Sequence, residues 1–412
     1  MKNLETLIQE LCPDGVEFRT MEEVFEIRNG YTPSKNNPDF WEGGTIPWFR
    51  MEDIRQNGRI LSDAIQHITP AAIKGKGLFP ANSIIIATTA TIGEHALVIA
   101  DSLANQQFTN LTVRKSLSAC LLPKFVFYYM FVIDEWCKKN VNAGNFASVD
   151  MKRFKKLEFP LPPIEVQTEI VHILDKLTSL EAELEAELDC RKRQYEYYRD
   201  KLLSFDNVGD QEVEWKKMSE VGTFIRGKRF VRTDIVEEGV PCIHYGDIYT
   251  YYGLTATKAK TYLKPEKAEK MKFASKNDVV IVGAGENNMD IGVGVAWLSD
   301  EEVAIHDACY IFKSKMNPRF VSHYLRGSNY HLQIKKYVCE GKICSISSKS
   351  IGRSLIPVPS LSEQERIANI LDRFEALSTS LQSGLPAEIA ARRQQYEHYR
   401  DKLLTFKRKG AA

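Results

Sequence analysis

The sequence lacks paired cysteines. Its eight cysteines include no C-x-x-C spacing, which many zinc sites and thiol redox motifs use. We therefore expect no metal site, and we expect reduced, mostly buried thiols, as is usual in a cytoplasmic protein. The eight are Cys12, Cys120, Cys137, Cys190, Cys242, Cys309, Cys339 and Cys344.

Long apolar segments are missing as well. No stretch approaches the ~20 apolar residues that a membrane-spanning helix needs. The first residues, MKNLETLIQELCPDG, contain no basic segment followed by an apolar one, so we expect no signal peptide. Both absences favour a cytoplasmic location.

No motif for catalysis stands out. The sequence has no G-x-x-x-x-G-K-[ST] loop for nucleotide phosphates, no H-x-x-x-H metal-ligand pair and no D…E-x-K cluster of the nuclease type. The G-x-G at residues 283–285 does not continue as a dinucleotide fingerprint. Residues 36–40, NNPDF, superficially resemble the N-P-P-[YF] turn of amino-methyltransferases, but an aspartate replaces the second proline and we interpret them as a turn. We therefore predict no catalytic residue, metal or cofactor in this chain.

The net charge of +1 argues against a surface covered with basic side chains for nucleic acid. The charge is unevenly distributed, however: residues 159–210 carry 6 basic and 12 acidic side chains, whereas residues 211–357 carry 22 and 17. Contacts with DNA would then come from local patches, and residues 211–357 are the best placed to provide one.

The chain contains an internal duplication. RKRQYEYYRDKLLSF at 191–205 matches RRQQYEHYRDKLLTF at 392–406, and PLPPIEVQTEIVHILD at 160–175 matches PVPSLSEQERIANILD at 357–372. Weaker matches at an offset of about 197 residues extend into the preceding segments, as between IPWFRMEDI (46–54) and VPCIHYGDI (240–248). Each copy thus comprises a globular block, or head, of about 150 residues and a helical block of about 50.

The helical blocks show apolar residues at steps of three and four, a pattern typical of a helix that packs along one stripe. Residues 165–205 predict one helix of 41 residues, which is too long to be buried alone and needs a partner stripe. The other copy supplies such a stripe from Ile367 to Leu381, and SGLP at 383–386 predicts two helices with a kink or short break there. A coiled coil between separate chains is the alternative, but the duplication favours an antiparallel pair within one chain, with a head at each end.

The sequence EAEL occurs twice in succession inside the long predicted helix, at 181–184 and 185–188, and the two helical copies differ in length by four residues in this region. One explanation is that Glu, Ala and Leu simply favour a helix. The other is that the number of units sets the distance between the heads. The candidate spacer residues are Glu181, Leu184, Glu185 and Leu188.

The heads show short β-rich runs, such as SIIIAT (83–88) and VVIVGAG (279–285), and helical runs at 121–140 and 317–337. This pattern predicts an α+β head with a twisted sheet in each copy. Loops rich in Thr, Asn, Gln and Lys offer the groups that contact base edges and phosphates, although such loops are common on any surface. We predict phosphate contacts by Lys74, Lys76, Lys258 and Lys260, and base-edge contacts by Thr89, Thr91, Gln106, Asn287 and Asn288; Lys35 and Arg229 complete the DNA-binding candidates.

Two divergent heads that alternate with two near-identical helical blocks, ending in RKRQYEYYRDKLL and RRQQYEHYRDKLL, resemble the specificity subunit of type I restriction-modification systems. GYTPS at 30–34, IPW at 46–48, ATIG at 90–93, NQ at 105–106 and GLPAEI at 384–389 add to the resemblance. The second head departs from the pattern, with GKRFVRT where the first has GYTPSK and IHDA where the first has NQQF. Its DNA preference is therefore not defined by the resemblance.

The resemblance implies two tandem α+β target-recognition domains, at 1–160 and 211–357, with helical spacers at 161–210 and 358–412 that form an intramolecular antiparallel coiled coil. It implies that each domain reads one half of a bipartite, asymmetric DNA site in the major groove. The paired helices would set the spacer and dock two modification subunits, and motor-nuclease subunits would join for cleavage. S-adenosylmethionine, ATP and Mg are then expected in the partner subunits.

Two other classes of function are alternatives. A methyltransferase or nuclease would show activity of the purified chain alone on unmethylated DNA, but its signatures are missing. A purely structural coiled-coil scaffold would not need two divergent heads with polar loops.

Overall fold

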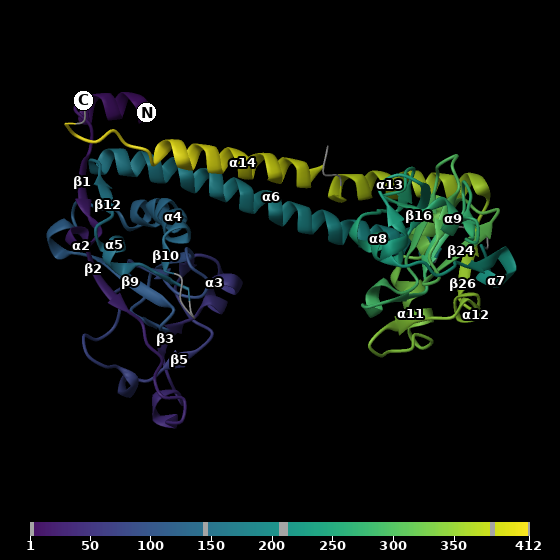
Figure 1. Cartoon of the computed structure of the whole chain (residues 1–412), viewed down its shortest axis with the longest axis horizontal. Coiled ribbons are helices and arrows are strands. Elements are labelled where there is room, and N and C mark those ends of the chain that lie inside the picture. Colours follow the sequence, from purple (N-terminus) through teal and green to yellow (C-terminus); the bar gives the residue numbers. More distant parts are fainter. Residues whose placement is uncertain (1–3, 143–146, 206–212, 380–383, 411–412) are drawn as a thin grey trace. The chain divides into compact units, whose positions relative to one another are not determined.

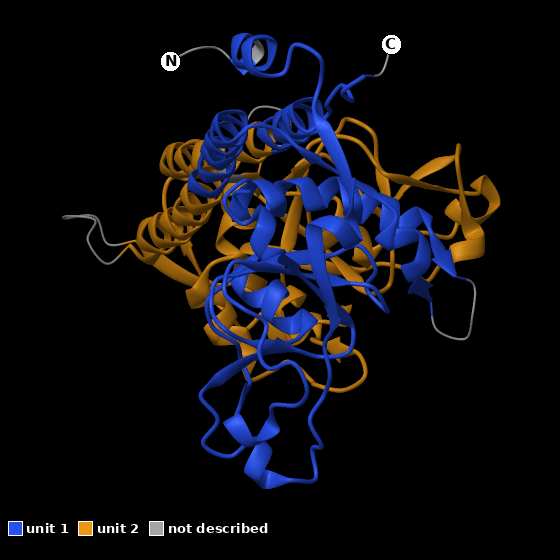
Figure 2. Ribbon diagram, turned by 90° about the vertical axis from the view of Figure 1, so that its left-hand side faces the viewer, with its two compact units in different colours: residues 1–183, 390–412 blue, residues 184–389 orange. Residues whose placement is uncertain are grey.

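The computed structural model describes residues 4–142, 147–205, 213–379 and 384–410. It divides into two compact units, residues 1–183 with 390–412 and residues 184–389 (Figure 2). Both divisions fall inside long helices, α6 (Ile164–Ser204) and α14 (Leu385–Leu403), so each unit combines one head with parts of the helical blocks. Within these ranges no helix is both long enough and apolar enough to cross a membrane.

The first head is built around a five-stranded sheet with the strand order β2-β9-β6-β7-β4, and a smaller sheet has the order β5-β3-β8 (Figure 1). Its helices and strands are α1 (Leu4–Leu11), β1 (Glu17–Thr20), α2 (Met21–Val24), β2 (Phe25–Asn29), β3 (Ile46–Phe49), α3 (Met51–Asn57), β4 (Ile60–Leu61), β5 (His67–Ile68), β6 (Ser83–Ala87), β7 (His95–Val98), β8 (Leu103–Ala104), β9 (Phe108–Val113), α4 (Pro123–Lys139), β10 (Val141–Asn142), β11 (Ser148–Val149), α5 (Met151–Lys155) and β12 (Glu158–Leu161).

The sequence of strand β6 is apolar without alternation because both faces of the strand are buried. Ile84 and Ile86 pack in a core with Phe125 of α4, whereas Ile85 packs in a second core with Trp48 of β3. Both faces of the strand are therefore buried, and a strand covered on both faces reads as a continuous apolar run. The predicted strand at 83–88 and helix at 121–140 are confirmed by β6 and α4.

The second head repeats this plan with two five-stranded sheets, ordered β14-β24-β20-β22-β17 and β15-β18-β16-β23-β19. Its helices and strands are β13 (Glu214–Lys217), α7 (Met218–Val221), β14 (Gly222–Arg226), β15 (Ile235–Val236), β16 (Val240–Ile243), α8 (Tyr245–Thr250), β17 (Thr255–Ala256), β18 (Thr261–Leu263), α9 (Pro265–Ala268), β19 (Phe273–Ala274), β20 (Val279–Val282), β21 (Ala284–Gly285), β22 (Gly294–Trp297), β23 (Val303–Ile305), β24 (Cys309–Ser314), α10 (Pro318–Tyr324), α11 (Ser328–Lys335), β25 (Cys344–Ser345), α12 (Ser348–Ile351) and β26 (Leu355–Val358).

Two runs predicted as single elements in the second head are divided. The helical run at 317–337 forms α10 and α11, because Gly327 has an extended backbone (φ −77°, ψ 147°) and the Ser328 amide donates to the Asp200 carboxylate of α6 (3.2 Å). The β run at 279–285 forms β20, which lies in the main sheet, and β21, which pairs with β25. Long-range partners thus decide where these elements end.

The helical blocks form the predicted antiparallel pairs. In the first unit, Arg393 of α14 bonds to Glu181 of α6 at 2.7 Å. In the second unit, Tyr198 of α6 stacks on Phe374 of α13 (Leu361–Thr379), with ring centroids 5.4 Å apart. The long helix predicted at 165–205 is confirmed by α6, and the predicted interruption by the end of α13 and the start of α14; residues 380–383 lie outside the described residues.

Each head is connected to its helix by a set of hydrogen bonds that recurs in both copies, here called the joint. The fully buried Gln167 of α6 donates to the Cys120 and Pro162 carbonyls (both 2.7 Å), and Gln364 of α13 donates in the same way to the Pro359 carbonyl (2.8 Å). About two helical turns further along, an aspartate of each helix accepts hydrogen bonds from the head. A change in the direction of either helix would therefore cost buried hydrogen bonds.

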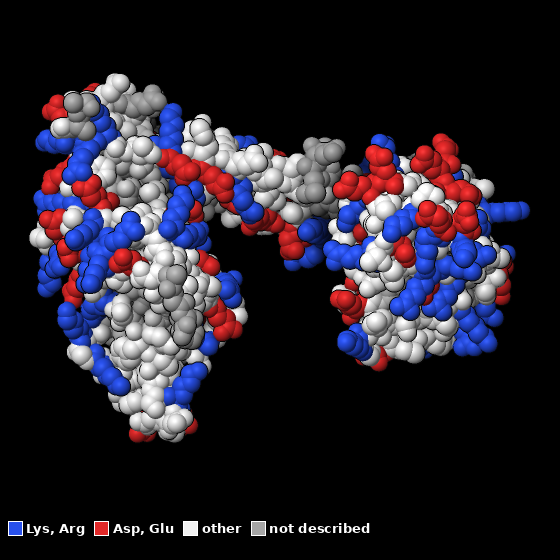
Figure 3. Space-filling model, viewed as in Figure 1, with Lys and Arg blue, Asp and Glu red and all other residues white. Residues whose placement is uncertain are grey.

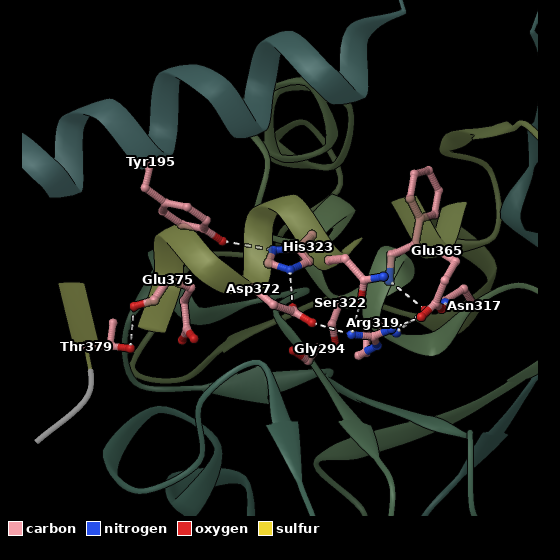
Figure 4. A network of polar contacts seen from close by, with 12 residues as sticks. Tyr195, Gly294, Asn317, Arg319, Ser322, His323, Glu365, Asp372, Glu375 and Thr379 are labelled. Carbon is pink, nitrogen blue, oxygen red and sulfur yellow. Dashed lines mark hydrogen bonds and ion pairs between the residues drawn. The ribbon is translucent and has the colours of Figure 1, made fainter. Parts of the chain in front are cut away.

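These aspartates are Asp175 and Asp372, and their partners differ. In the first unit, the Tyr128 hydroxyl donates to Asp175 at 2.7 Å. In the second, the buried His323 ring donates through Nε2 to Asp372 (2.8 Å) and contacts the Tyr195 hydroxyl through Nδ1 (3.0 Å), as Figure 4 shows. A histidine thus replaces a tyrosine at the same place in the repeated joint.

Candidate nucleic-acid interface

In the first unit, three loops meet at one end of the five-stranded sheet. The end of β2 at Asn29 lies opposite Thr109, near the start of β9. The end of β6 at Ala87 lies opposite Phe108, the first residue of β9. The loops after β2 and β6 therefore emerge beside the loop before β9, and together these three loops form the first loop cluster.

The second unit has the same arrangement. Arg226 at the end of β14 lies opposite Tyr310, and Val282 at the end of β20 lies opposite Cys309 at the start of β24. The loops after β14 and β20 and the loop before β24 form the second loop cluster. The duplication has thus preserved a backbone frame that presents three loops at corresponding places.

A glycine fixes each cluster. The Gly30 amide donates to the Phe108 carbonyl (2.8 Å), and the Gly227 amide donates to the Cys309 carbonyl (3.0 Å). A Cβ atom at either position would lie 2.2 Å from a backbone oxygen of the neighbouring loop, so any larger residue would force the loops apart. The alignment of residue 30 with residue 227 is therefore confirmed.

The alignment of IHDA with NQQF is wrong by one residue. The Asn105 amide bonds to the Phe49 carbonyl (3.0 Å), and the His306 amide bonds to the Ile243 carbonyl (3.2 Å), so Asn105 corresponds to His306. Here the local offset between the copies is 201 and not 200, because the intervening loops differ in length.

The candidate residues of the first head lie in or beside the first loop cluster. Lys35 is exposed, the exposed Gln106 accepts a hydrogen bond from the Thr32 hydroxyl, and Thr89 pairs through its backbone with Ser148. Thr91 differs, because its hydroxyl oxygen is buried without a hydrogen-bond partner among the described residues. These assignments stay predictions.

Lys74 and Lys76 lie on a neighbouring loop that is fixed to the end of β2. Arg28 donates to the Lys76 and Leu78 carbonyls (3.0 and 2.6 Å), and the Lys74 amide donates to the Tyr31 hydroxyl (2.8 Å). Both lysine side chains are exposed, and Lys76 lies 3.6 Å from Glu26. A surface ion pair of this kind is weak enough to leave the lysine available for a phosphate.

The candidates of the second head are less uniform. Arg229 is exposed and Lys258 is exposed, and neither has a hydrogen-bond or ion-pair partner in the part of the chain that the structure describes. Lys260 forms an ion pair with Asp247 (3.3 Å) and lies over the Tyr251 ring. Asn287 caps a short helical turn by accepting from the Met289 amide (3.1 Å), and Asn288 donates to Glu340 (2.6 Å).

Sequence reasoning missed two histidines of the second loop cluster. A hollow of about 370 Å³ lies there, lined in part by Arg229, His244, Tyr245, Glu286 and His306. The two imidazole rings lie 4.6 Å apart. The duplication could have indicated both, because His244 corresponds to Arg50, which likewise precedes a short helix, and His306 corresponds to Asn105.

Burial governs the charge of these histidines. It lowers the pKa of His244, and burial together with repulsion from the protonated form of His244 lowers the pKa of His306. Both rings are therefore neutral at pH 7. A neutral imidazole has one N–H donor and one acceptor nitrogen, which suits hydrogen bonding to a base edge better than ion pairing with phosphate.

The candidate spacer residues lie on α6. Glu181 bonds to Arg393, Leu184 and Leu188 are half-buried, and Glu185 is exposed. Figure 3 shows a row of acidic side chains along the long helices and basic side chains spread over both heads. The face of the helices shown there is therefore unsuited to DNA, whereas the heads are not.

The described residues contain no group of three or more His, Cys, Asp or Glu side chains placed to hold a metal ion. Of the eight cysteines, Cys12, Cys137, Cys242, Cys309 and Cys344 are buried, and none forms a disulfide within the described ranges. The prediction of mostly buried thiols is confirmed.

Comparison with known proteins bears on both halves of the chain. Residues 13–189 and 211–391 match the family described as the type I restriction modification DNA specificity domain. The chain is 38% identical over 383 residues to the type I restriction enzyme EcoprrI specificity subunit of Escherichia coli, covering 89% of this chain and 90% of that one. It is 35% identical over 306 residues to the type I restriction enzyme EcoR124I/EcoR124II specificity subunit of Escherichia coli, and the match covers 69% of this chain and 71% of that one.

One solved structure shares the fold. It is described as "Structural basis underlying complex assembly and conformational transition of the type I R-M system", and its matching chain superposes with a TM-score of 0.67 at 15% sequence identity, covering 95% of this chain and 97% of that one.

Proposed function

The chain belongs to the type I restriction-modification DNA specificity family and is a non-catalytic, DNA-recognising subunit, and on this premise we propose that each loop cluster reads one half of a bipartite, asymmetric DNA site. The first cluster presents Lys35, Thr89 and Gln106, and the second presents Arg229 and Asn287. The flanking lysines Lys74, Lys76, Lys258 and Lys260 contact phosphates.

The observation that carries this proposal is the repeated frame with different side chains. Both clusters emerge at the same end of corresponding sheets and are closed by corresponding glycines, Gly30 and Gly227. The residues on the frame differ, as Asn105 and His306 do. Because the two loop clusters share one backbone geometry, both would approach DNA in the same way. Because their hydrogen-bonding side chains differ, they would bind two different short sequences.

The paired helices serve as the spacer between the half-sites and as the platform for the partner subunits in this proposal. Two modification subunits dock on them, and motor-nuclease subunits join for cleavage. S-adenosylmethionine, ATP and Mg belong to these partners. Support comes from the near-identity of the helical blocks at 191–205 and 392–406, since two copies of one surface suit two copies of one partner.

Mapping of methylated bases in cells that carry this subunit with its partners tests the proposal. We expect one motif with two specified parts of different sequence, separated by a fixed number of unspecified base pairs. A continuous motif, or two identical half-sites, would contradict it.

A further inference from the structure

The hollow in the second loop cluster holds hydrogen-bond donors whose partners are missing within the described chain. It is lined by residues from the loop after β14, from the end of β16, from the segment after β20 and from the loop before β24, and by Ile343 before β25. Five separate segments therefore converge on a space of about 370 Å³. Such convergence of polar groups is typical of a binding site.

His306 is fully occupied by the protein. Its Nε2 lies 3.2 Å from the Phe230 carbonyl, and its Nδ1 accepts from the Ala308 amide (3.1 Å). A carbonyl oxygen can only accept, so the proton of this neutral ring lies on Nε2. His306 is a positioning residue, and its ring forms one wall against which His244 packs.

His244 has one nitrogen to spare. Its Nδ1 accepts from the Gly246 amide (3.3 Å), which places the proton of the neutral ring on Nε2. No described residue accepts a hydrogen bond from Nε2. The ring is held by its cap contact and by His306, so this N–H is a fixed donor at the wall of the hollow.

Arg229 adds further donors at the rim, and Glu286 adds an acceptor. The Arg229 guanidinium has no ion-pair or hydrogen-bond partner among the residues that the structure describes, and its charge is close enough to lower the pKa of His306. Glu286 is exposed and lines the same hollow. The site thus offers several donors side by side, with two carboxylates next to them: Glu286, and Asp307, whose Oδ1 lies 3.3 Å from Nδ1 of His306.

We infer that this hollow reads a G·C base pair in the second half-site, with His244 donating to guanine N7 and Arg229 donating to guanine O6. Guanine presents two acceptors, N7 and O6, in the major groove, and the cytosine of the same pair presents an amino donor that Glu286 can accept. Adenine would place its amino donor against the donors of the hollow and leave them unpaired, which is costly. The chemistry therefore selects guanine over adenine.

The first head does not share this chemistry. Arg50 stands in place of His244 and forms an ion pair with Glu52 (2.9 Å), and Asn105 stands in place of His306. Thr32 stands in place of Arg229 and donates to Gln106. The inference therefore concerns one half-site only, and the other half-site provides an internal control.

This inference rests on the proposed function, and the test uses the assembled complex with its modification subunits. Once the motif is mapped, binding is measured to duplexes in which each guanine of the second half-site is replaced in turn by 7-deazaguanine, which lacks the N7 acceptor. We expect one such replacement to weaken binding of the wild type by about tenfold. His244→Phe keeps an aromatic ring in place but removes the Nε2 donor, together with the Nδ1 acceptor of the cap, so the variant should bind both duplexes alike. His244→Gln restores a donor and should recover part of the preference.

Arg229→Ala should reduce the preference for the G·C pair over an A·T pair, again by about tenfold. Lys276→Ala is the matched control, because Lys276 is an exposed cation that precedes β20 at the opposite end of the sheet, and it should leave the preference unchanged. The inference is overturned if the second half-site contains no G·C pair, or if wild type and His244→Phe respond equally to every 7-deazaguanine. In either case a bipartite motif would leave the proposed function standing, whereas a continuous motif would overturn that function itself.

Discussion

Side chains at corresponding positions of the two heads have different chemical properties. The position occupied by Tyr128 in the first unit is occupied by His323 in the second, and both bond to an aspartate of the adjoining helix. A tyrosine hydroxyl donates at any physiological pH, whereas a histidine changes its charge near pH 6.5. The two joints should therefore respond differently to acid.

Burial of His323 predicts a loss of stability in mild acid. Its side chain is fully buried, and burial lowers its pKa, against the opposing effect of Asp372. Above about pH 6.5 the ring is neutral in both the folded and the unfolded chain. Below that pH the ring binds a proton in the unfolded chain but stays neutral in the folded chain, whose pKa is lower. The free energy of unfolding of the second unit should then fall as the pH drops from 7.5 to 5.5, by at most about 1.4 kcal/mol per pH unit for this site.

Urea denaturation of His323→Gln at several pH values checks this. The variant keeps polar contacts with Asp372 and Tyr195 but cannot titrate, so its pH dependence should be smaller than that of the wild type. His172→Gln, an exposed change on α6, should retain the wild-type dependence. Equal pH dependence in wild type and His323→Gln would show that the charges facing the ring, on Asp372, Arg326 and Arg199, compensate for its burial.

Residues of the interface could be predicted from sequence only in part. Lys35, Gln106 and Arg229 were recognisable because polar residues on loops between strands tend to be exposed, and they are. The hollow around His244 could not be predicted. An alignment of the two copies at one constant offset of 197 misaligns these positions, because the local offset is 194 at His244 and 201 at His306. Only strand pairing brings these two histidines together.

Among the elements, the long helices were the most predictable. Their periodicity is local, and α6 begins and ends within one residue of its predicted bounds. The short strands were harder, because their ends depend on partners far along the chain: Ala284 leaves the main sheet to pair with Ser345. Local sequence carries no record of such a partner.

The EAEL repeat makes α6 a testable spacer. Its two units lie within the continuous helix, with Leu184 and Leu188 half-buried on one face. Insertion of a third unit after Leu188 lengthens the helix by about 6 Å and rotates the following part by about 40°. That length is comparable to one or two base pairs, at ~3.4 Å each.

The insertion variant should therefore keep both half-site sequences and gain about one or two unspecified base pairs between them. Deletion of one unit should shorten the spacer. Methylation mapping decides the matter, and a fully active insertion variant with an unchanged spacer would show that α6 does not set the distance.

The duplication explains the molecule as a whole. One ancestral plan, a head followed by a helix, occurs twice, and each head lies in its own compact unit. Sequence alone established this plan, since both copies align over nearly their whole length. It could not establish where the compact units divide, because each unit takes helical segments from both copies.

The central claim is that each head carries its own half-site, and exchange of one head tests it most directly. Residues 1–158 are replaced with the first head of another family member, and the methylated motif of the resulting complex is mapped. One half of the motif should change to that of the donor, while the other half and the spacer stay as they were. A change in both halves, or in neither, would contradict the account.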